Sequence, residues 1–231
     1  MPISNYDGNT FVAFLDISGF RELMGDERKA WKALDRLYEY GYEILSGQGD
    51  ERRVDGIFVS DSGVLFVRRN NQIPRTSDDL VSLLIVLRRI NKRMLDNGFM
   101  LTTSIAYGRF RYQERIEFRG IGKNAVYGNA YVSAFFDNEN GKPRIQPGQC
   151  RMIERDLPSQ TKNRIAQTQS DNIFGMIKKR EGDSKHYYYY WMVDHCNEIE
   201  GFEQEYKDTY SLKYAGMLKA LKGEGHQRYM Q

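Results

Sequence analysis

Segments with strand-like and helix-like patterns alternate in a fixed order through the first half of the chain, and this order constrains the fold most. The run Phe11–Leu15 is wholly apolar, as in a buried strand, and it stops at Asp16. From Glu27 to about Leu45, apolar residues recur every three or four positions, which predicts an amphipathic helix. Two β-rich runs follow at residues 53–59 and 63–67, which predicts a hairpin.

A second helix and another strand complete this pattern. The helical period continues from Leu80 to Met94 after a capping aspartate at position 78 or 79, and Asn97-Gly98 ends it. Residues 100–107 have the composition of a strand that stops at Gly108. The order β-α-β-β-α-β predicts an α+β fold of the ferredoxin-like type, an antiparallel sheet with helices on one face.

The remaining sequence is less regular, and no linker divides it. We therefore expect a single domain over residues 1–231, with a core at about 11–195 and a C-terminal helical extension at about 200–225. The further elements that we expect are a helix at 127–136, strands at 172–179 and 186–193, and a final helix at 202–221.

Composition excludes several classes of protein. The chain has 34 basic and 31 acidic residues, a net charge of +3 that is too small to favour a nucleic-acid partner. It has no apolar run long enough to span a membrane, and its N-terminus lacks the features of a secretory signal, so we expect a cytoplasmic protein. Cys150 and Cys196 are too far apart in sequence to indicate a zinc site or a disulfide framework.

Two aspartates fall where a metal site could form. In a ferredoxin-like core the first strand and the central hairpin are neighbours, so Asp16 and Asp61, at the hairpin turn, should approach each other. A carboxylate pair beside a turn with free backbone N–H groups, here Ser18 to Phe20, suits Mg²⁺ or Mn²⁺ bound next to a polyphosphate. The alternative is that Asp16 only caps its turn and Asp61 only fills the hairpin tip.

Four blocks resemble class III nucleotidyl cyclases. FVAFLDISGF, at residues 11–20, is similar to the family's first strand and turn, and GIFVSDSGVLF is similar to its metal-binding hairpin, although Ser60 replaces the usual glycine. LTTSIAYG and VYGNAYVSA resemble a later strand and the loop and helix that follow it. The blocks occur in the family order over roughly residues 11–140, and the first is the most specific.

The resemblance implies a function for several residues. Asp16 and Asp61 would bind two divalent ions, Mn²⁺ or Mg²⁺, with the carbonyl oxygen of Ile17 completing one coordination shell. The ribose 3′-hydroxyl of a nucleoside triphosphate would attack the α-phosphorus, giving a 3′,5′-cyclic nucleotide and diphosphate in active sites at a homodimer interface. The residues implied in substrate binding are Ser18, Gly19, Phe20 and Lys185, the last of which could equally lie in a solvated charged loop.

The chain also departs from the family. Ile57 and Ala125 stand where adenylate cyclases have the lysine and aspartate that recognise adenine, and Ile57 would therefore meet the base without a polar group. Val132 and Phe136 stand in place of the asparagine and arginine that orient the ribose and stabilise the transition state. Either the chain is a degenerate relative, or another cation replaces the arginine. The candidates are Arg109, Arg111, Arg119 and Lys123.

These departures are similar to those of the short, stand-alone pyrimidine cyclases of Pycsar antiphage defence. That resemblance implies a uridylate cyclase that makes cyclic UMP from UTP, or alternatively a cytidylate cyclase that makes cyclic CMP from CTP. The product would activate a separate effector protein. Two other hypotheses are a catalytically degenerate nucleotide-binding homologue and a ferredoxin-like RNA-binding domain, although the latter would need a basic excess that the chain lacks.

Overall fold

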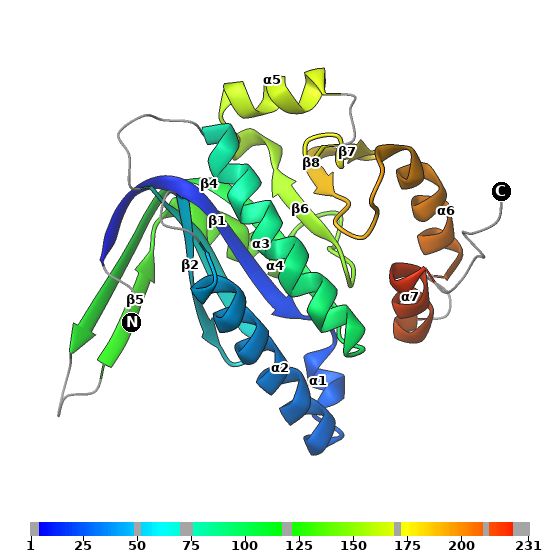
Figure 1. Ribbon diagram of the computed structural model, residues 1–231, viewed down its shortest axis with the longest axis horizontal. Coiled ribbons are helices and arrows are strands. Elements are labelled where there is room, and N and C mark those ends of the chain that lie inside the picture. The colour runs from blue at the N-terminus through cyan, green and yellow to red at the C-terminus, as the bar shows by residue number, and fades with distance from the viewer. Residues whose placement is uncertain are drawn as a thin grey trace.

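A computed structural model of the protein describes residues 5–48, 52–69, 76–116, 122–168, 172–209 and 213–223 (Figure 1). The six predicted core elements are present in the predicted order. They are β1 (Tyr6–Ile17), α2 (Glu27–Ser46), β2 (Arg52–Val59), β3 (Ser62–Arg69), α3 (Thr76–Asp96) and β4 (Leu101–Ile116).

The core strands form an antiparallel sheet with β1 at its centre. β1 pairs with β3 on one side and with β4 on the other, and β2 pairs with the outer edge of β3. This is the order β2-β3-β1-β4 of a ferredoxin-like core, so the predicted α+β fold is confirmed.

The later elements extend the sheet beyond β4. A short strand, β6, runs parallel to β4, and β8 and β7 follow it, while β5 pairs with the far end of β4. The elements are α1 (Phe20–Leu23), β5 (Gly122–Tyr127), α4 (Asn129–Asn140), β6 (Cys150–Ile153), η2 (Glu154–Asp156), α5 (Ser159–Gln167), β7 (Ile177–Arg180), β8 (Asp183–Tyr189), η3 (Cys196–Glu198), α6 (Ile199–Thr209) and α7 (Lys213–Lys222).

Several boundaries differ from those expected. β4 continues through Gly108, because β5 supplies a second partner for its far half. Tyr127 belongs to β5, and the helix predicted at 127–136 therefore starts at Asn129. Residues 172–176 form a turn rather than a strand, since the Asn172 side chain accepts hydrogen bonds from the next backbone N–H groups, those of Phe174 and Gly175. The single predicted C-terminal helix is two helices, α6 and α7.

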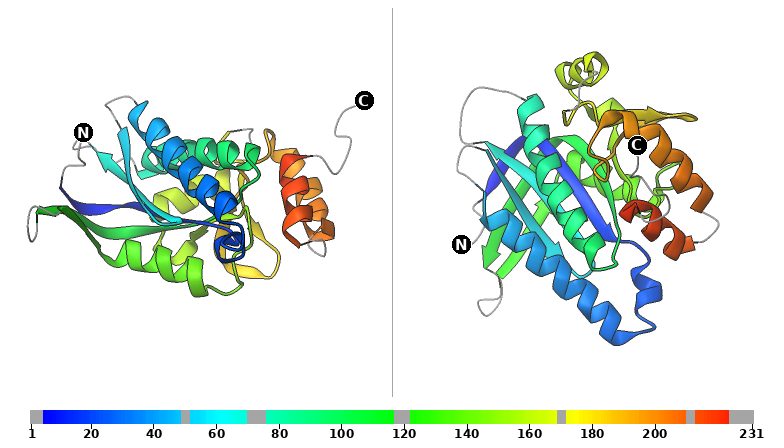
Figure 2. Two further views of the ribbon diagram at one scale, coloured as in Figure 1. Left: turned by 90° about the horizontal axis from the view of Figure 1, so that it is seen from below. Right: turned by 45° about the vertical axis from the view of Figure 1, so that its right-hand side comes forward.

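Helices cover both faces of the sheet, not one face as expected. α2 and α3 lie on one side and α4 on the other (Figure 2). The reason is visible in β1, where Phe11, Ala13 and Leu15 enter the core beneath α2 and α3, while Val12 and Phe14 enter two smaller clusters that include residues of α4. A strand that is apolar on both sides needs cover on both sides.

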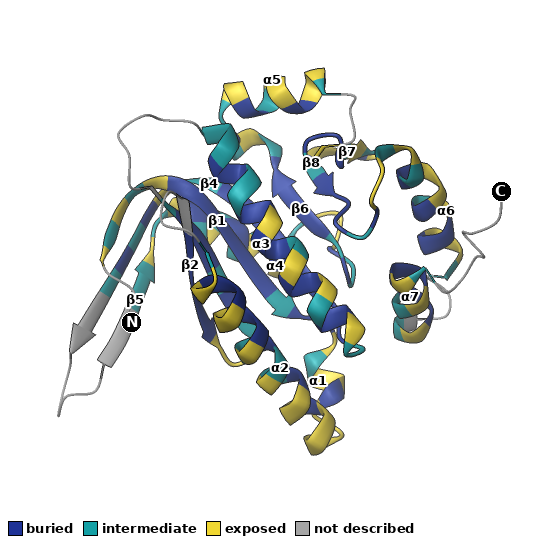
Figure 3. Ribbon diagram, viewed as in Figure 1, coloured by how far each residue is buried: buried dark blue, intermediate teal, exposed yellow. Residues whose placement is uncertain are grey.

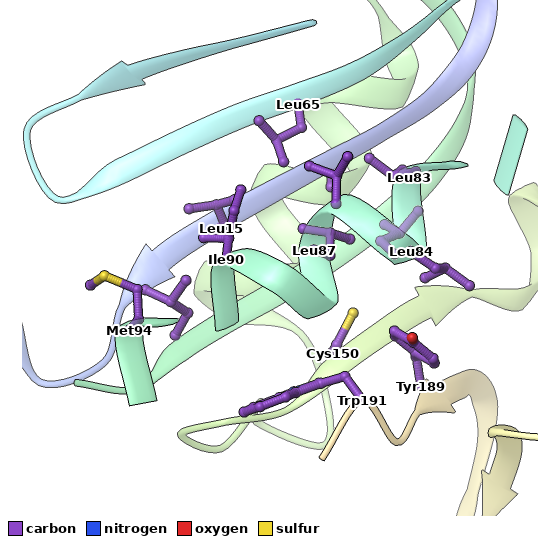
Figure 4. Packing of buried hydrophobic residues seen from close by; sticks show 14 of the residues in the cluster. Leu15, Leu65, Leu83, Leu84, Leu87, Ile90, Met94, Cys150, Tyr189 and Trp191 are labelled. Carbon is purple, nitrogen blue, oxygen red and sulfur yellow. The ribbon is translucent and has the colours of Figure 1, made fainter. Parts of the chain in front are cut away.

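The main core lies between the sheet and α3 and extends under the C-terminal strands (Figures 3 and 4). Leucines at the helical spacing in α3 contact Leu15 and Leu65 of the sheet, and Cys150, Tyr189 and Trp191 continue the same cluster. Each such side chain contributes about 1.5–3 kcal/mol by its burial. This continuous cluster joins the C-terminal strands to the ferredoxin-like core.

Close packing of α2 against the hairpin depends on Gly41. A Cβ atom added there would lie 2.2 Å from the Phe58 ring, so only glycine lets α2 approach β2 this closely. Asp26 caps the N-terminus of α2, because its side chain accepts a hydrogen bond from the Lys29 N–H at 3.2 Å. The helix therefore holds the β2–β3 hairpin against the end of β1.

In the described part of the chain, no helix combines the length and the apolar character that crossing a bilayer requires.

Candidate active site

The end of β1 and the tip of the β2–β3 hairpin bring two carboxylates together. Asp16 lies opposite Ser62 of β3 in the strand register, and the Ser62 hydroxyl donates a hydrogen bond to the Asp16 Oδ1 atom at 2.8 Å. Asp61 lies in the turn before Ser62, and its carbonyl oxygen accepts a hydrogen bond from the Ile17 N–H at 3.0 Å. The turn is thereby fixed to β1.

The electrostatic environment of Asp16 disfavours its charged form. The pKa of Asp16 is raised to about 7, mainly by burial and also by the carboxylates of Asp61 and Glu139, while the hydrogen bond from Ser62 acts in the opposite direction. Glu139 lies near the end of α4, and the sequence patterns did not single it out. A positive charge at this place would relieve the repulsion among the carboxylates.

The residues present fit a divalent ion. Within the described ranges, no group of three or more His, Cys, Asp or Glu side chains has the arrangement of a protein-only metal cage. Mg²⁺ and Mn²⁺ are commonly held by one or two carboxylates, with water and substrate phosphates completing the shell. Asp16 and Asp61 supply such a pair, beside the backbone carbonyl of Ile17.

The hairpin turn has a backbone conformation that favours glycine. Ser60 has φ 55°, in the left-handed region, and no other non-glycine residue in the described chain has a positive φ. This is the position where the resembling family has glycine.

Replacing Ser60 with glycine is expected to raise the free energy of unfolding by about 1 kcal/mol, because it removes the cost of the left-handed conformation. Urea unfolding of the Ser60→Gly variant measures this gain. Gly replacement of Ser62 is the matched control, since Ser62 has an extended backbone and donates to Asp16, so stability should fall there. A loss of stability in Ser60→Gly would contradict the account of the turn.

A pocket of about 460 Å³ opens beside Asp16, and we call it the Asp16 pocket. Its wall is formed by the turn after β1, the start of β4, the end of α4, a loop that leads to β6, and α7. Its lining residues are Asp16, Ser18, Gly19, Thr102, Asn138, Glu139, Arg144, Ile145, Gln146, Pro147 and Met217.

The predicted phosphate-binding turn partly lines this pocket. Ser18 is buried and Gly19 has φ 71°, and both line the Asp16 pocket. Phe20 begins the short helix α1 and packs against the main core instead. Tyr214 of α7 also contacts this region, because its hydroxyl accepts a hydrogen bond from the Met100 N–H at 3.1 Å and its ring lies against Gly19.

Two other predicted substrate-binding residues lie away from the Asp16 pocket. Ile57 is buried among apolar side chains on the α4 face of the sheet and does not line the pocket. Lys185, on β8, lines a second pocket of about 690 Å³ together with Val132 and Phe136 of α4. We call this second site the Lys185 pocket. One protomer therefore does not bring Lys185 to the aspartate pair.

Two of the four candidate cations, Arg109 and Arg111, have partners away from the aspartate pair. Arg109 forms an ion pair with Asp7 at 2.6 Å, and Arg111 pairs with the same carboxylate, so both are held at the start of β1. Arg119 lies outside the described residues, and the side chain of Lys123 is likewise not described. Instead, the basic side chain that lines the Asp16 pocket is Arg144.

Comparison with known proteins identifies the fold. No family model and no curated protein sequence matches the chain. The adenylyl cyclase CyaB from P. aeruginosa is 16% identical with a TM-score of 0.54, over 80% of this chain and 95% of that one. The guanylate cyclase domain of RhGC from Catenaria anguillulae, solved with GTP, is 12% identical with a TM-score of 0.55, over 80% of this chain and 97% of that one.

A third solved structure agrees with these two. The dimeric guanylyl cyclase domain of RhoGC from Blastocladiella emersonii is 11% identical with a TM-score of 0.55, over 81% of this chain and 98% of that one. All three similarities span nearly the whole of the cyclase domains. The chain therefore has the fold of the catalytic domains of adenylyl and guanylyl cyclases.

Proposed function

We propose that the protein is a nucleotidyl cyclase that converts a nucleoside triphosphate to a 3′,5′-cyclic nucleotide and diphosphate. The observation that carries this proposal is the pairing of Asp16 with Asp61 at the end of β1 in a cyclase fold. Many proteins of one fold differ in chemistry, so the site rather than the fold supports the reaction.

The residues of this chain would hold and orient the reactants. Two bound Mn²⁺ or Mg²⁺ ions would supply Lewis-acid activation of the 3′-hydroxyl and charge neutralisation at the phosphates. Asp16 and Asp61 would hold the ions, and Ser62 would fix the orientation of the Asp16 carboxylate. Ser18 and Gly19 would lie beside the triphosphate in the Asp16 pocket.

We further propose that the active unit is a homodimer with active sites at the interface. Val132 and Phe136 lie one helical turn apart on α4, with 43% and 56% of their surfaces exposed, around the Lys185 pocket. Exposed apolar side chains at this spacing form a face that a second protomer can cover. In that arrangement, Lys185 would reach the triphosphate held by the partner's aspartates.

For the substrate we propose UTP first and CTP second, within a Pycsar defence system whose separate effector responds to the cyclic pyrimidine nucleotide. Ile57 is buried in an apolar cluster and cannot form a hydrogen bond with a base, and Ala125 also lacks a polar side chain. Neither position can read adenine as an adenylate cyclase does. This absence supports a base other than adenine.

A catalytically degenerate nucleotide-binding protein is the second candidate. It is favoured by Val132 and Phe136, which are apolar where the family has its asparagine and arginine. Such a protein would bind a nucleoside triphosphate without forming a cyclic product.

The test is to incubate the purified protein with Mn²⁺ and each of ATP, GTP, CTP and UTP, and to identify products by chromatography and mass spectrometry. We expect cyclic UMP or cyclic CMP from the unmodified protein and none from Asp61→Ala. A cyclic purine nucleotide would support the cyclase reaction and contradict the proposed pyrimidine substrate. Binding without any product would instead support the degenerate protein.

A further inference from the structure

Two residues that line the Asp16 pocket each carry a buried polar atom without a hydrogen-bond partner in the described structure. These atoms are the Ser18 Oγ atom and the Asn138 Nδ2 atom, on residues that are 4% and 7% exposed. A buried polar group without a partner costs about 1–3 kcal/mol, so native proteins rarely keep one without a use. Both residues line the pocket beside Asp16, where a bound ligand would satisfy them.

Asn138 is held so that its amide N–H₂ group remains available. Its Oδ1 atom accepts a hydrogen bond from the Thr102 hydroxyl at 3.1 Å, which leaves the Nδ2 atom as the unpaired donor. The neighbouring Asp137 accepts a hydrogen bond from the Ser104 hydroxyl at 2.7 Å. These two bonds fix the end of α4 on β4, next to the pocket.

Arg144 is the basic side chain that the described structure places at this pocket, and its guanidinium forms no ion pair with the described residues. The loop that carries it is held at several points. The buried Arg151 donates from Nη1 to the Pro143 carbonyl at 2.6 Å, and the Gln146 side chain donates to the Arg144 carbonyl at 3.0 Å. Ile145 is buried directly after it. The Arg144 guanidinium therefore extends from a loop whose backbone is held in place by hydrogen bonds.

We infer that Arg144, together with Asn138 and Ser18, binds the terminal phosphates of the substrate and the diphosphate that leaves. This inference rests on the proposed cyclase function. One guanidinium and two hydroxyl or amide donors match the acceptor oxygens of a diphosphate, and Arg144 offsets the negative charge of Asp16 and Glu139. The pocket volume of about 460 Å³ is within the usual range for small-ligand sites.

The role of Arg144 in the reaction follows from where charge develops. As the bond from the 3′-oxygen to the α-phosphorus forms, the bond from that phosphorus to the bridging oxygen breaks. The electron pair of the broken bond stays on the diphosphate, and the 3′-hydroxyl proton passes to water. Arg144 would stabilise this leaving charge from the same protomer as the aspartates, which compensates for the apolar Phe136 on α4.

Binding of inorganic diphosphate, measured by calorimetry without nucleotide, tests the inference separately from catalysis. We expect Arg144→Ala to weaken diphosphate binding about 10- to 100-fold, the effect of losing a charge-assisted hydrogen bond, and Arg144→Lys to recover part of it. Asn138→Leu should weaken it by a smaller factor. In turnover, Arg144→Ala should lower kcat about 100-fold or more.

Lys207→Ala is the matched control. Arg144 and Gln146 also line a neighbouring pocket, which we call the Arg180 pocket, and Lys207 lines that pocket but not the Asp16 pocket. Diphosphate affinity that falls in Lys207→Ala as much as in Arg144→Ala would place the anion in the Arg180 pocket and overturn the inference. Unchanged affinity in Arg144→Ala would overturn it as well, even in an active cyclase. Arg144-dependent binding in a protein that forms no cyclic nucleotide would support the pocket and reject the cyclase.

Discussion

Replacing Asp16 with asparagine is expected to end cyclic-nucleotide formation and, in the metal-free protein at neutral pH, to stabilise the fold. Asparagine removes one of the two carboxylates that would hold the ions, and the loss of turnover should be at least about 100-fold. Its side-chain oxygen can still accept the hydrogen bond from Ser62. The same substitution thus separates a catalytic role from a structural one.

The stabilisation follows from the raised pKa of Asp16. Burial and the neighbouring carboxylates raise this pKa from 3.8 to about 7, so the folded state binds the proton more tightly than the unfolded state does. Asp16 therefore lowers the free energy of unfolding progressively as the pH rises from the unfolded pKa to the folded pKa, and the loss is complete above it. Because Asp16 is partly solvated, we discount the shift and expect a gain of about 1–2 kcal/mol for Asp16→Asn at about pH 8.

Urea unfolding with a chelator at about pH 4 and about pH 8 measures this difference, which should be small at the lower pH. Asp35→Asn, on the exposed side of α2, is the control and should have the same free energy of unfolding as the unmodified protein at both pH values. Adding Mn²⁺ should stabilise the unmodified protein and not Asp16→Asn. A variant that is less stable than the unmodified protein at the higher pH would contradict our account of the site.

The first half of the site could be predicted from sequence because its residues lie on regular elements. The apolar run of β1 fixes where Asp16 stands, and the β2–β3 hairpin must lie beside β1 in this topology, which brings Asp61 close. Periodicity alone was enough for that step. The same reasoning identified the ferredoxin-like core.

The other part of the site, formed by Asn138, Glu139 and Arg144, could not be predicted, because it depends on packing between distant segments. Glu139 and Asn138 reach the pocket only because α4 covers the opposite face of the sheet, and Arg144 lies in a loop without periodicity. Pro143 and Pro147 flank that loop and are the sequence signal for a fixed conformation there. Ile57, in contrast, is predicted to contact the substrate only from the resemblance to adenylate cyclases, which have a lysine at this position.

A buried arginine, Arg151, connects the end of α4 to the loop that carries Arg144. Its removal should lower the free energy of unfolding more than any other substitution proposed for this protein. Arg151 is fully buried on β6, and it donates to the Asp137 carboxylate from Nε at 2.8 Å and from Nη2 at 3.0 Å. Burial would raise the pKa of Asp137, but hydrogen bonds from His186, Arg151 and Ser104 together with the Arg151 charge hold it below its usual value. The arginine therefore keeps a buried carboxylate ionised.

Arg151→Met keeps the side-chain volume but leaves Asp137 buried without its main cationic partner, and we expect the free energy of unfolding to fall by about 3–5 kcal/mol. The stability that the lowered pKa of Asp137 provides is present above the unfolded pKa and is lost as pH falls through the folded value. The difference between the variant and the unmodified protein should therefore shrink in acid. Urea unfolding at neutral and acid pH measures both effects.

The same variant links the fold to the site. Arg151 does not line the Asp16 pocket, yet its bond to the Pro143 carbonyl fixes the loop that presents Arg144. Arg151→Lys keeps the charge but cannot make all four hydrogen bonds, the fourth of which runs from Nη2 to the Asp137 carbonyl at 2.8 Å, so it should lose less stability and still weaken diphosphate binding. Arg155→Ala removes a neighbouring arginine whose side chain is 79% exposed, and should change stability by less than about 0.5 kcal/mol. If Arg151→Met were as stable as Arg155→Ala, the buried ion pair would have no part in holding the site.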